Sequence, residues 1–437
     1  MSKIVLSDQG QLDPEEKMSV DQIREIQTER TAKILKYAYE NVPLYTKKFD
    51  DQGVHPDDFK ELSDLAKFPY TTKEDLRITY PFGMFAVPME QVARIHASSG
   101  TTGRATVVGY TKNDLDTWAR LGARCFRMAG VRPGMKVHNA YGYGLFTGGL
   151  GAHAAIEAAG ATVIPMSGGQ TDKQITLIED FKPDAIAATP TYLLTIGDAM
   201  QKKGLDPRKT SLRYAILGAE PWTQEMRDEL EDMFDLKASD IYGLSEVMGP
   251  GVAGENYELQ DGSHIWEDHF APEIIDPFDE RRQLGDGEEG ELVFTTLTKE
   301  ALPIIRYRTH DLTRLLPGTA REGHRRIGRI SGRSDDMIIL RGVNLFPSQI
   351  EELIFKVEGL SPHFQLEITR PKRMDELTVK VERRDDCTSD RADEAGKELQ
   401  RLIKIHIGSS CRIDVVEPAT LERSMGKLKR IYDLRNK

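Results

Sequence analysis

Three short apolar runs decide the fold: ATVIP at residues 161–165, AIAA at 185–188 and YAIL at 214–217. Each has the length of a buried β-strand. Amphipathic segments with helical spacing, at 173–181 and 191–203, separate them. Strands that alternate with helices indicate βαβ units, in which parallel strands form one sheet and helices cover its faces. We therefore expect an α/β fold with a mostly parallel sheet.

The sequence changes character on both sides of this core. Residues 1–80 are polar, and their apolar side chains recur at helical spacing. After the core, strands and turns are predicted, with residues 290–295 and 312–316 as candidate strands. The last part of the chain alternates strands and helices over about a hundred residues, which is a normal size for a small α+β domain. We expect a large domain over 1–334, including a β-rich subdomain, and a small domain over 335–437.

Composition excludes several classes of protein. The 437 residues carry 59 Lys plus Arg and 70 Asp plus Glu, a net charge of −11, which removes the long-range attraction to nucleic acid. The three cysteines lie far apart, without a CxxC pair, so neither a disulfide scaffold nor a cysteine-rich zinc module is expected. No apolar run approaches the ~18 residues of a membrane span, and the N-terminus does not resemble a secretory signal. A cytoplasmic protein, bound to no membrane, is the expectation.

The sharpest local motif is SSGTTGRAT at residues 98–106. Its glycines let backbone amides turn inward, while its hydroxyls can donate to oxyanions, a combination suited to phosphate. It is not a Walker A loop, because no Gly-Lys-Ser/Thr closes it. Composition alone leaves a flexible surface connector equally open.

Four further motifs follow along the chain: DIYGLSE at 240–246, RYRTHD at 306–311, GRSDD at 332–336 and ERSMGKLKR at 422–430. The first follows a predicted strand, and α/β sheets bind ligands at the carboxyl ends of their strands. Taken alone, its Glu246 is better interpreted as a solvated carboxylate. The last motif, taken alone, is better interpreted as an ordinary basic tail.

The five motifs in this order resemble those of the adenylate-forming superfamily, which includes acyl-CoA synthetases, the adenylation domains of peptide synthetases and luciferases. Longer stretches are similar to the phenylacetate–CoA ligase family within it: YPFGMFAVP at 80–88, IWEDHF at 265–270 and RGVNLFPSQIEE at 341–352. The resemblance covers nearly the whole chain from about residue 15. It implies a large N-terminal adenylate-forming domain and a small mobile C-terminal lid.

The resemblance implies an ATP-dependent enzyme that joins phenylacetate, or a related arylacetic acid, to coenzyme A. The carboxylate would attack the α-phosphate of ATP to give an acyl-AMP and pyrophosphate, and the CoA thiol would then attack the acyl carbon. ATP, CoA and the aryl acid are thus the expected small-molecule partners, with Mg²⁺ as the metal. A homodimer is left open, because dimers are common among soluble enzymes.

Two alternatives stay open. One is another synthetase of the same architecture that acts on a different aryl acid or on coenzyme F420. The other is a non-catalytic sensor of acyl-CoA or AMP, which is disfavoured because Lys427, Glu246 and Asp311 are all present.

The resemblance also implies roles for single residues. Lys427 is the expected catalytic cation, Glu246 the Mg²⁺ ligand and Asp335 the hinge. The expected ATP- and AMP-binding residues are Ser98, Ser99, Gly100, Thr101, Thr102, Gly103, Gly218, Ala219, Glu220, Pro221, Asp240, Ile241, Tyr242, Gly243, Ser245, Asp311 and Arg333.

The acid pocket is expected in YGYGLFTGG at 141–149, where aromatic side chains can face a ring and glycines leave room for it. Core packing at a strand end is the alternative. The resemblance favours a pocket walled by Tyr141, Phe146 and Gly148. A second cluster, HIWEDH at 264–269, could present metal ligands, but an ordered hydrogen-bonded loop is favoured because no cysteine lies nearby.

Overall fold

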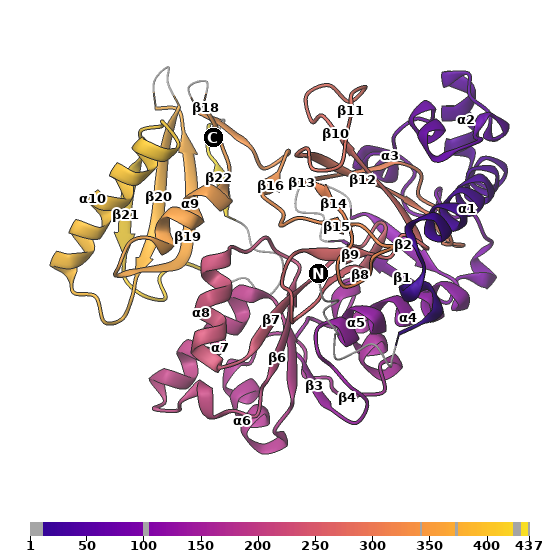
Figure 1. The fold of residues 1–437 in the computed structure, drawn as a ribbon. Coiled ribbons are helices and arrows are strands. Elements are labelled where there is room, and N and C mark those ends of the chain that lie inside the picture. Colours follow the sequence, from indigo (N-terminus) through magenta and orange to yellow (C-terminus); the bar gives the residue numbers. More distant parts are fainter. Residues whose placement is uncertain (1–11, 99–104, 341–342, 372–374, 423–429, 436–437) are drawn as a thin grey trace, which may run out of the picture. The chain divides into compact units, whose positions relative to one another are not determined.

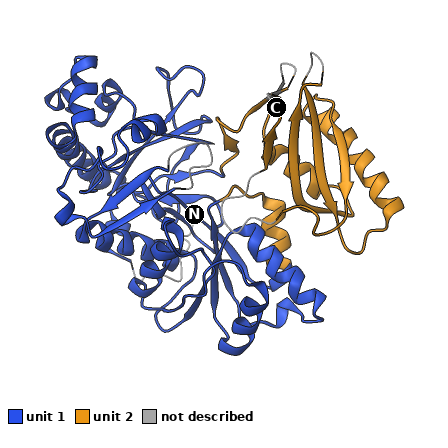
Figure 2. Cartoon of the chain, turned by 180° about the vertical axis from the view of Figure 1, so that it is seen from behind, with its two compact units in different colours: residues 1–219, 233–329 blue, residues 220–232, 330–437 orange. Residues whose placement is uncertain are grey.

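The computed structural model describes residues 12–98, 105–340, 343–371, 375–422 and 430–435 (Figure 1). The chain divides into two compact units, coloured separately in Figure 2. Unit 1 comprises Met1–Ala219 and Met233–Arg329, and unit 2 comprises Glu220–Asp232 and Ile330–Lys437.

A nine-stranded sheet forms the centre of unit 1. Its strands, in spatial order, are β14 (Leu315–Leu316), β15 (Arg326–Ile327), β9 (Ser263–Ile265), β8 (Met248–Glu255), β7 (Lys237–Leu244), β6 (Tyr214–Gly218), β5 (Ala185–Ala188), β3 (Lys136–Asn139) and β4 (Thr162–Ile164). The strands from β7 to β4 are parallel, as the apolar runs predict, whereas those from β7 to β14 are antiparallel. The predicted α/β fold is confirmed, and its central sheet contains both parallel and antiparallel strands.

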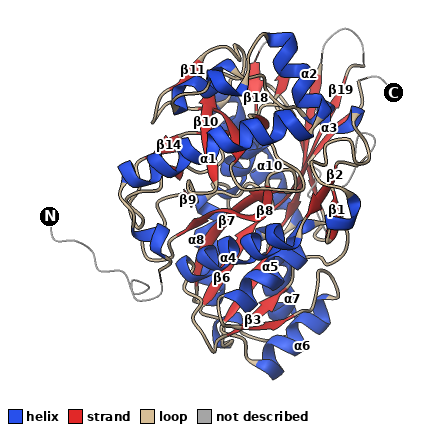
Figure 3. Cartoon of the chain, turned by 90° about the vertical axis from the view of Figure 1, so that its right-hand side faces the viewer, coloured by secondary structure: helices blue, strands red, loops and turns tan. Residues whose placement is uncertain are grey.

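Helices cover this sheet. They are α4 (Lys112–Met128), α5 (Thr147–Ala158), α6 (Thr171–Phe181) and α7 (Pro190–Lys202), and α8 (Gln224–Phe234) crosses the division between the units. Helices α4 and α5 pack on each other and on β8, and α6 packs on α7 (Figure 3). Thr111 and Asp114 begin α4 with a capping box, in which each side chain accepts from the other residue's amide.

The N-terminal part of unit 1 is helical, as predicted. It contains α1 (Val20–Asn41), α2 (Pro43–Gln52) and α3 (Lys73–Ile78), with short 3₁₀ turns at Pro14–Lys17, Pro56–Asp58, Leu62–Lys67 and Met89–Gln91. One more 3₁₀ turn, at Pro207–Lys209, lies further along the chain, between α7 and β6. The hairpin of β1 (Arg94–Ala97) and β2 (Val107–Tyr110) then encloses the segment with the serine- and glycine-rich motif.

A second, antiparallel sheet of unit 1 contains β11 (Gln283–Leu284), β10 (Phe270–Ile275), β12 (Gly290–Thr296) and β13 (Tyr307–Thr313). The predicted strand over 312–316 is wrong in its bounds, because the chain passes from this sheet to the nine-stranded sheet at Arg314. Strand β13 ends at Thr313 and β14 begins at Leu315, where the chain pairs with β15. The Gly328 amide, next to β15, donates to the Arg314 carbonyl at 3.0 Å.

Unit 2 has its own hydrophobic core. Its elements are β16 (Gly332–Arg333), β17 (Ile338–Leu340), β18 (Val343–Leu345), α9 (Pro347–Phe355), β19 (Leu360–Thr369), β20 (Glu376–Arg383), α10 (Ser389–His406), β21 (Arg412–Val416) and β22 (Ile431–Asp433). Apolar residues alternate along β19 and β20, and they pack on α9 and α10 through Leu366, Val379 and Leu399. The predicted boundary between residues 334 and 335 lies within unit 2. The assignment of Asp335 as the hinge stays a prediction.

Among the described residues, no helix is both long and apolar enough to cross a membrane.

Candidate active site

Several predicted site residues follow or end the parallel strands of unit 1. Tyr141 lies just beyond β3, Gly218 ends β6, and Tyr242 lies in the second half of β7. Ser245 and Glu246 occupy the turn between β7 and β8. Because the carboxyl ends of parallel strands meet at one edge of a sheet, these residues belong to the edge where such sheets bind ligands.

Backbone packing explains two glycines of the predicted nucleotide site. A Cβ on Gly218 would lie 2.2 Å from the Ile241 carbonyl oxygen, and a Cβ on Gly243 would lie 2.6 Å from the Met248 carbonyl oxygen. Only glycine lets these backbones approach so closely. Ala219, which follows Gly218, has a φ of 74°, a left-handed conformation that is uncommon for a residue with a side chain.

Tyr242 and Asp311 meet although they belong to different sheets. The Tyr242 hydroxyl donates to Oδ2 of Asp311 at 2.6 Å. The backbone around Asp311 is also specified, since its amide donates to Thr309 Oγ1 at 3.0 Å and His310 adopts a left-handed φ of 64°. The Asp311 carboxylate is therefore held in one orientation, with only 9% of the residue exposed.

The turn that carries Ser245 and Glu246 is fixed from several sides. Thr147 Oγ1, in the first turn of α5, lies 3.1 Å from Ser245 Oγ. The Lys299 ammonium donates to the carbonyl oxygens of Glu246 at 3.2 Å and Val247 at 3.0 Å. Burial lowers the pKa of Lys299 to about 8, although nearby Asp114 and Glu246 act in the opposite direction. Sequence reasoning missed Lys299, and it gave Thr147 no role of its own within the stretch at 141–149.

The predicted acid pocket lies beside this turn in the fold, at the start of α5. Tyr141 is buried, and its hydroxyl donates to the Ile216 carbonyl oxygen at 3.3 Å. Phe146 is 44% exposed and is the N-cap residue of α5. A Cβ on Gly148 would lie 3.9 Å from Tyr141 Cβ, an ordinary van der Waals distance. There is thus space at Gly148 next to an aromatic wall.

The phosphate-loop motif is closed at its base. The Ser98 amide donates to the Thr106 carbonyl oxygen at 2.9 Å, and the Thr106 amide donates to Ser98 Oγ at 3.2 Å. The carbonyl oxygen of Leu145, from the predicted acid pocket, accepts from the Ala97 amide at 2.9 Å. The base of the loop is thereby tied to the pocket segment. Ser99, Gly100, Thr101, Thr102 and Gly103 lie outside the described residues, as does Lys427.

Among the described residues, four of the predicted ones belong to unit 2: Glu220, Pro221, Arg333 and Asp335. The Arg333 guanidinium forms a two-pronged ion pair with Asp335, with Nε 2.8 Å from Oδ1 and an Nη atom 3.0 Å from Oδ2. Asp335 is exposed, so this pair contributes little to stability.

Glu246 has the chemistry of a magnesium ligand. Mg²⁺ is usually held by one or two carboxylates together with substrate phosphates and water, rather than by a cage of protein ligands. The single carboxylate of Glu246, on the turn that follows β7, fits that pattern. In the described part of the chain, no three His, Cys, Asp or Glu side chains are grouped so that they could hold a metal ion.

The cluster at 264–269 is joined to the protein by hydrogen bonds. His264 is fully buried, its Nε2 accepts from the amides of Thr319 and Arg321, and burial lowers its pKa. The Arg124 guanidinium donates to both carboxylate oxygens of Asp268, at 3.0 and 2.9 Å. These contacts are typical of an ordered loop.

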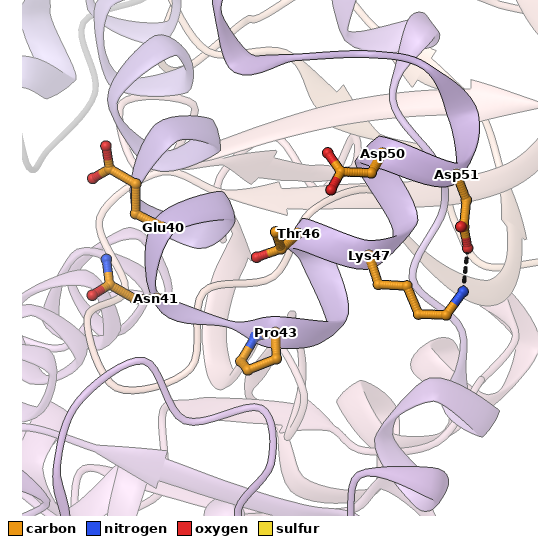
Figure 4. Close-up of a pocket in the computed structure, with 7 residues that line it drawn as sticks. All are labelled: Glu40, Asn41, Pro43, Thr46, Lys47, Asp50 and Asp51. Atoms are coloured by element: carbon orange, nitrogen blue, oxygen red, sulfur yellow. Dashed lines mark hydrogen bonds and ion pairs between the residues drawn. The ribbon is translucent and has the colours of Figure 1, made fainter.

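A surface pocket of about 510 Å³ lies where α1 meets α2 (Figure 4). Its lining residues are Glu40, Asn41, Pro43, Thr46, Lys47, Asp50 and Asp51, and Lys47 and Asp51 form an ion pair. None of them is a predicted site residue.

The chain is similar to known proteins over nearly its whole length. The model of the AMP-binding enzyme family matches residues 3–297, and that of the AMP-binding enzyme C-terminal domain matches residues 342–435. The chain is 60% identical over 433 residues to the phenylacetate-coenzyme A ligase of Aromatoleum evansii, covering 98% of both chains. It is also 60% identical over 429 residues to that of Escherichia coli (strain K12), covering 97% of this chain and 98% of the other.

A solved structure of 2-hydroxyisobutyryl-CoA ligase in complex with 2-HIB-AMP is 26% identical, with a TM-score of 0.92 over 99% of this chain and 94% of that one. The fold and the matched models define an AMP-binding enzyme. Within that class, the chain belongs to the phenylacetate–coenzyme A ligase family. The resemblance inferred from the motifs is confirmed, and the chain is an AMP-forming ligase.

Proposed function

We propose that this enzyme joins phenylacetate, or a closely related arylacetic acid, to coenzyme A while ATP is converted to AMP and pyrophosphate. A carboxylate is a poor acylating agent because its leaving group would be an oxide. Attack of a carboxylate oxygen on the α-phosphorus releases pyrophosphate and forms an acyl-AMP, whose AMP leaves readily. Attack of the CoA thiol on the acyl carbon then gives the thioester and AMP.

One observation carries the proposal. The Tyr-Gly-Leu-Ser-Glu turn and Asp311 meet at one edge of the sheet, in a chain that is 60% identical over nearly its full length to enzymes named for this reaction. The solved relatives add that an enzyme of this fold holds 2-HIB-AMP and, in another complex, 2-HIB-AMP together with CoA.

The nucleotide would be bound by residues from several elements. The amides and hydroxyls of Ser98, Ser99, Gly100, Thr101, Thr102 and Gly103 would hold the β- and γ-phosphates. Gly218, Ala219, Glu220 and Pro221, with Asp240, Ile241, Tyr242 and Gly243, would enclose the adenine. Ser245 would lie near the α-phosphate, Asp311 would accept from the ribose hydroxyls, and Arg333 would donate nearby. The supporting observation is the fixed orientation of Asp311 by Tyr242.

Charge at the reacting centre would come from two groups. Glu246 would hold Mg²⁺, whose charge offsets that of the phosphates. Lys427 would donate to the acid carboxylate and the α-phosphate during the first step, because a placed cation stabilises charge that develops there. Tyr141, Phe146 and Gly148 would line the acid pocket. We further propose a homodimer and a location in the cytoplasm.

Pyrophosphate release over a small panel of acids, with and without CoA, tests the proposed function. Phenylacetate, indoleacetate, benzoate, acetate and 2-hydroxyisobutyrate are suitable members. We expect CoA-independent formation of acyl-AMP, and AMP rather than ADP as the product, with phenylacetate or indoleacetate preferred. A preference for acetate or 2-hydroxyisobutyrate would contradict the proposed substrate class.

A Lys427→Ala variant provides the control for mechanism. In this variant the activation barrier for acyl-AMP formation should rise by several kcal/mol, the scale expected when a preorganised charge is removed. Thioester formation from supplied acyl-AMP should stay close to the wild-type rate, because the second step does not need that cation. An unchanged first step would exclude this role for Lys427.

A further inference from the structure

Lys299 is a buried cation that no motif of the sequence indicates. It lies between β12 and β13, and only 2% of the residue is exposed. Its ammonium donates to the carbonyl oxygens of Glu246 and Val247 and lies 4.7 Å from the centre of the Tyr110 ring. Burying an ammonium group is expensive, and a methionine would fill a similar volume without that cost. The position therefore calls for a specific reason to hold a lysine.

The segment that carries Lys299 is itself anchored to α4. The buried carboxylate of Asp114 accepts from the Glu300 amide at 2.7 Å and from the Ala301 amide at 2.9 Å. The same carboxylate accepts from the Thr111 amide at the start of α4. Because Asp114 belongs to the capping box of that helix, the backbone beside Lys299 has little freedom to move.

The turn that Lys299 contacts, at residues 245–247, carries two proposed active-site groups. Lys299 holds the carbonyl oxygens of residues 246 and 247, and the Tyr110 hydroxyl makes a long contact of 3.5 Å with the carbonyl oxygen of Ser245. The side chain of Ser245 meets Thr147. The turn is thus held through its backbone on the side of Tyr110 and Lys299, and through a side chain on the side of α5.

We propose that Lys299 is a positioning residue of the active site: it links the α4-anchored segment at 299–301 to the Ser245–Val247 turn and so fixes the direction of the Ser245 and Glu246 side chains. The inference rests on the proposed function for what the turn binds. Its geometry rests on the hydrogen bonds of Lys299 and Asp114 alone. Lys299 acts through the backbone and touches no substrate.

The test is Lys299→Met, which keeps the volume and removes the donors. Misplacing reacting groups by about 1 Å costs about 100-fold in rate. We therefore expect the rate of pyrophosphate exchange to fall about 100-fold. The rate of thioester formation from supplied acyl-AMP should fall by about tenfold or less. Hydrogen exchange of the peptide that spans residues 244–249 should speed up at least tenfold, since the Val247 amide is bonded to the Leu244 carbonyl within this turn.

Lys48→Met is the matched control. The Lys48 ammonium also holds a backbone carbonyl, that of Tyr70 at 2.6 Å, and it pairs with Asp75 at 2.7 Å in the N-terminal part of unit 1. Lys48→Met should lower the melting temperature. It should affect the rates of the two half-reactions equally and leave hydrogen exchange at 244–249 unchanged. Lys299→Arg keeps N–H donors in a different geometry and should recover part of the lost rate of pyrophosphate exchange.

Equal losses in the two half-reactions, with unchanged hydrogen exchange at 244–249, would overturn the proposal. If Lys299→Met does not fold, Lys299→Gln, which keeps a polar side chain in the site, is measured in its place with the same expected and contradicting results. Failure of the proposed function is distinguishable: the wild type would then exchange pyrophosphate with no acid of the panel, while hydrogen exchange would still decide whether Lys299 fixes the turn.

Discussion

The Tyr242 hydroxyl donates a hydrogen bond of 2.6 Å to Oδ2 of Asp311. The bond joins β7 of the nine-stranded sheet to β13 of the antiparallel sheet. Asp311 is 9% exposed, so its direction is set by the protein more than by water. A carboxylate held in this way is suited to accept from two adjacent hydroxyl groups, such as those of a ribose.

Tyr242→Phe tests this relationship, because it removes one hydroxyl and keeps the ring. Hydrogen bonds to charged groups contribute about 1.5–3 kcal/mol. We expect the KM for ATP in pyrophosphate exchange to rise about tenfold, since Asp311 loses its fixed direction, while kcat changes little. Asp311→Ala should raise it further. An unchanged KM for ATP in both variants would separate Asp311 from ribose recognition.

Gly148→Ala tests the wall of the acid pocket. The new Cβ would lie 3.9 Å from Tyr141 Cβ, so it fits the fold, and alanine in a helix is favoured over glycine by about 0.5–1 kcal/mol. We expect an unchanged or higher melting temperature. The ratio of kcat/KM for indoleacetate to that for phenylacetate should fall about tenfold, because one methyl-sized change contributes about 1–3 kcal/mol.

Gly149→Ala and Phe146→Ala are its controls. A Cβ on Gly149 would lie 2.5 Å from the Gly142 carbonyl oxygen, so this variant should lose stability instead. Removing the ring of Phe146 should shift the acid preference toward indoleacetate, the opposite direction to Gly148→Ala. If neither Gly148→Ala nor Phe146→Ala changed the ratio of kcat/KM for the two acids, other residues would form the walls of the pocket.

Asp335→Pro tests the predicted hinge, because proline fixes φ and removes a donor. The two half-reactions need different groups over one site, and a rotation at the boundary would provide them. We expect adenylation to survive while thioester formation from acyl-AMP falls steeply. Asp335 also pairs with Arg333, so a purely local role would lower both half-reactions together with the melting temperature. Measuring both half-reactions beside a melting curve distinguishes these results.

We expect Glu351 to make the stability of unit 2 depend on pH. Burial raises the pKa of its carboxyl to about 7 from an ordinary value of 4.5, although its partner Arg430 acts in the opposite direction. The folded state therefore binds the proton more tightly than the unfolded state does. The resulting contribution is fully present below about pH 4.5 and is lost as the pH rises through about 7.

Denaturant unfolding of the wild type and of Glu351→Gln, from about pH 5 to pH 8, measures this contribution. The free energy of unfolding of the wild type should decrease relative to that of the variant by at most about 3 kcal/mol over this range. A difference that does not change with pH would mean that Glu351 stays ionised in its pair with Arg430.

Local patterns predict most of this fold. The runs at 185–188 and 214–217 become β5 and β6 almost residue for residue, because parallel strands buried on both faces are continuously apolar. The single strand predicted over 312–316 is wrong because the chain changes sheet at Arg314, and local sequence does not reveal that residues 315–316 pair with β15. Strand β22 is missed for the same reason, since three residues pair with β19 only through tertiary contact.

The site divides in a similar way. Tyr242, Ser245, Glu246 and Asp311 stand in motifs that can be recognised in the sequence. Lys299 carries no such signal, because a single lysine is usually exposed and its role depends on which carbonyl oxygens it meets. Thr147 stands in the stretch at 141–149, but its contact with the Ser245 hydroxyl depends on the fold. Positioning residues of this kind are found only when the fold is known.

In the proposed first step, a carboxylate oxygen of the acid attacks the α-phosphorus of ATP. Phenylacetate labelled with ¹⁸O in both carboxylate oxygens, converted with unlabelled ATP and CoA, tests it by mass spectrometry of the products. We expect one ¹⁸O atom in AMP for every thioester formed, and none in pyrophosphate. Unlabelled AMP, or ¹⁸O in pyrophosphate or inorganic phosphate, would contradict an acyl-AMP intermediate.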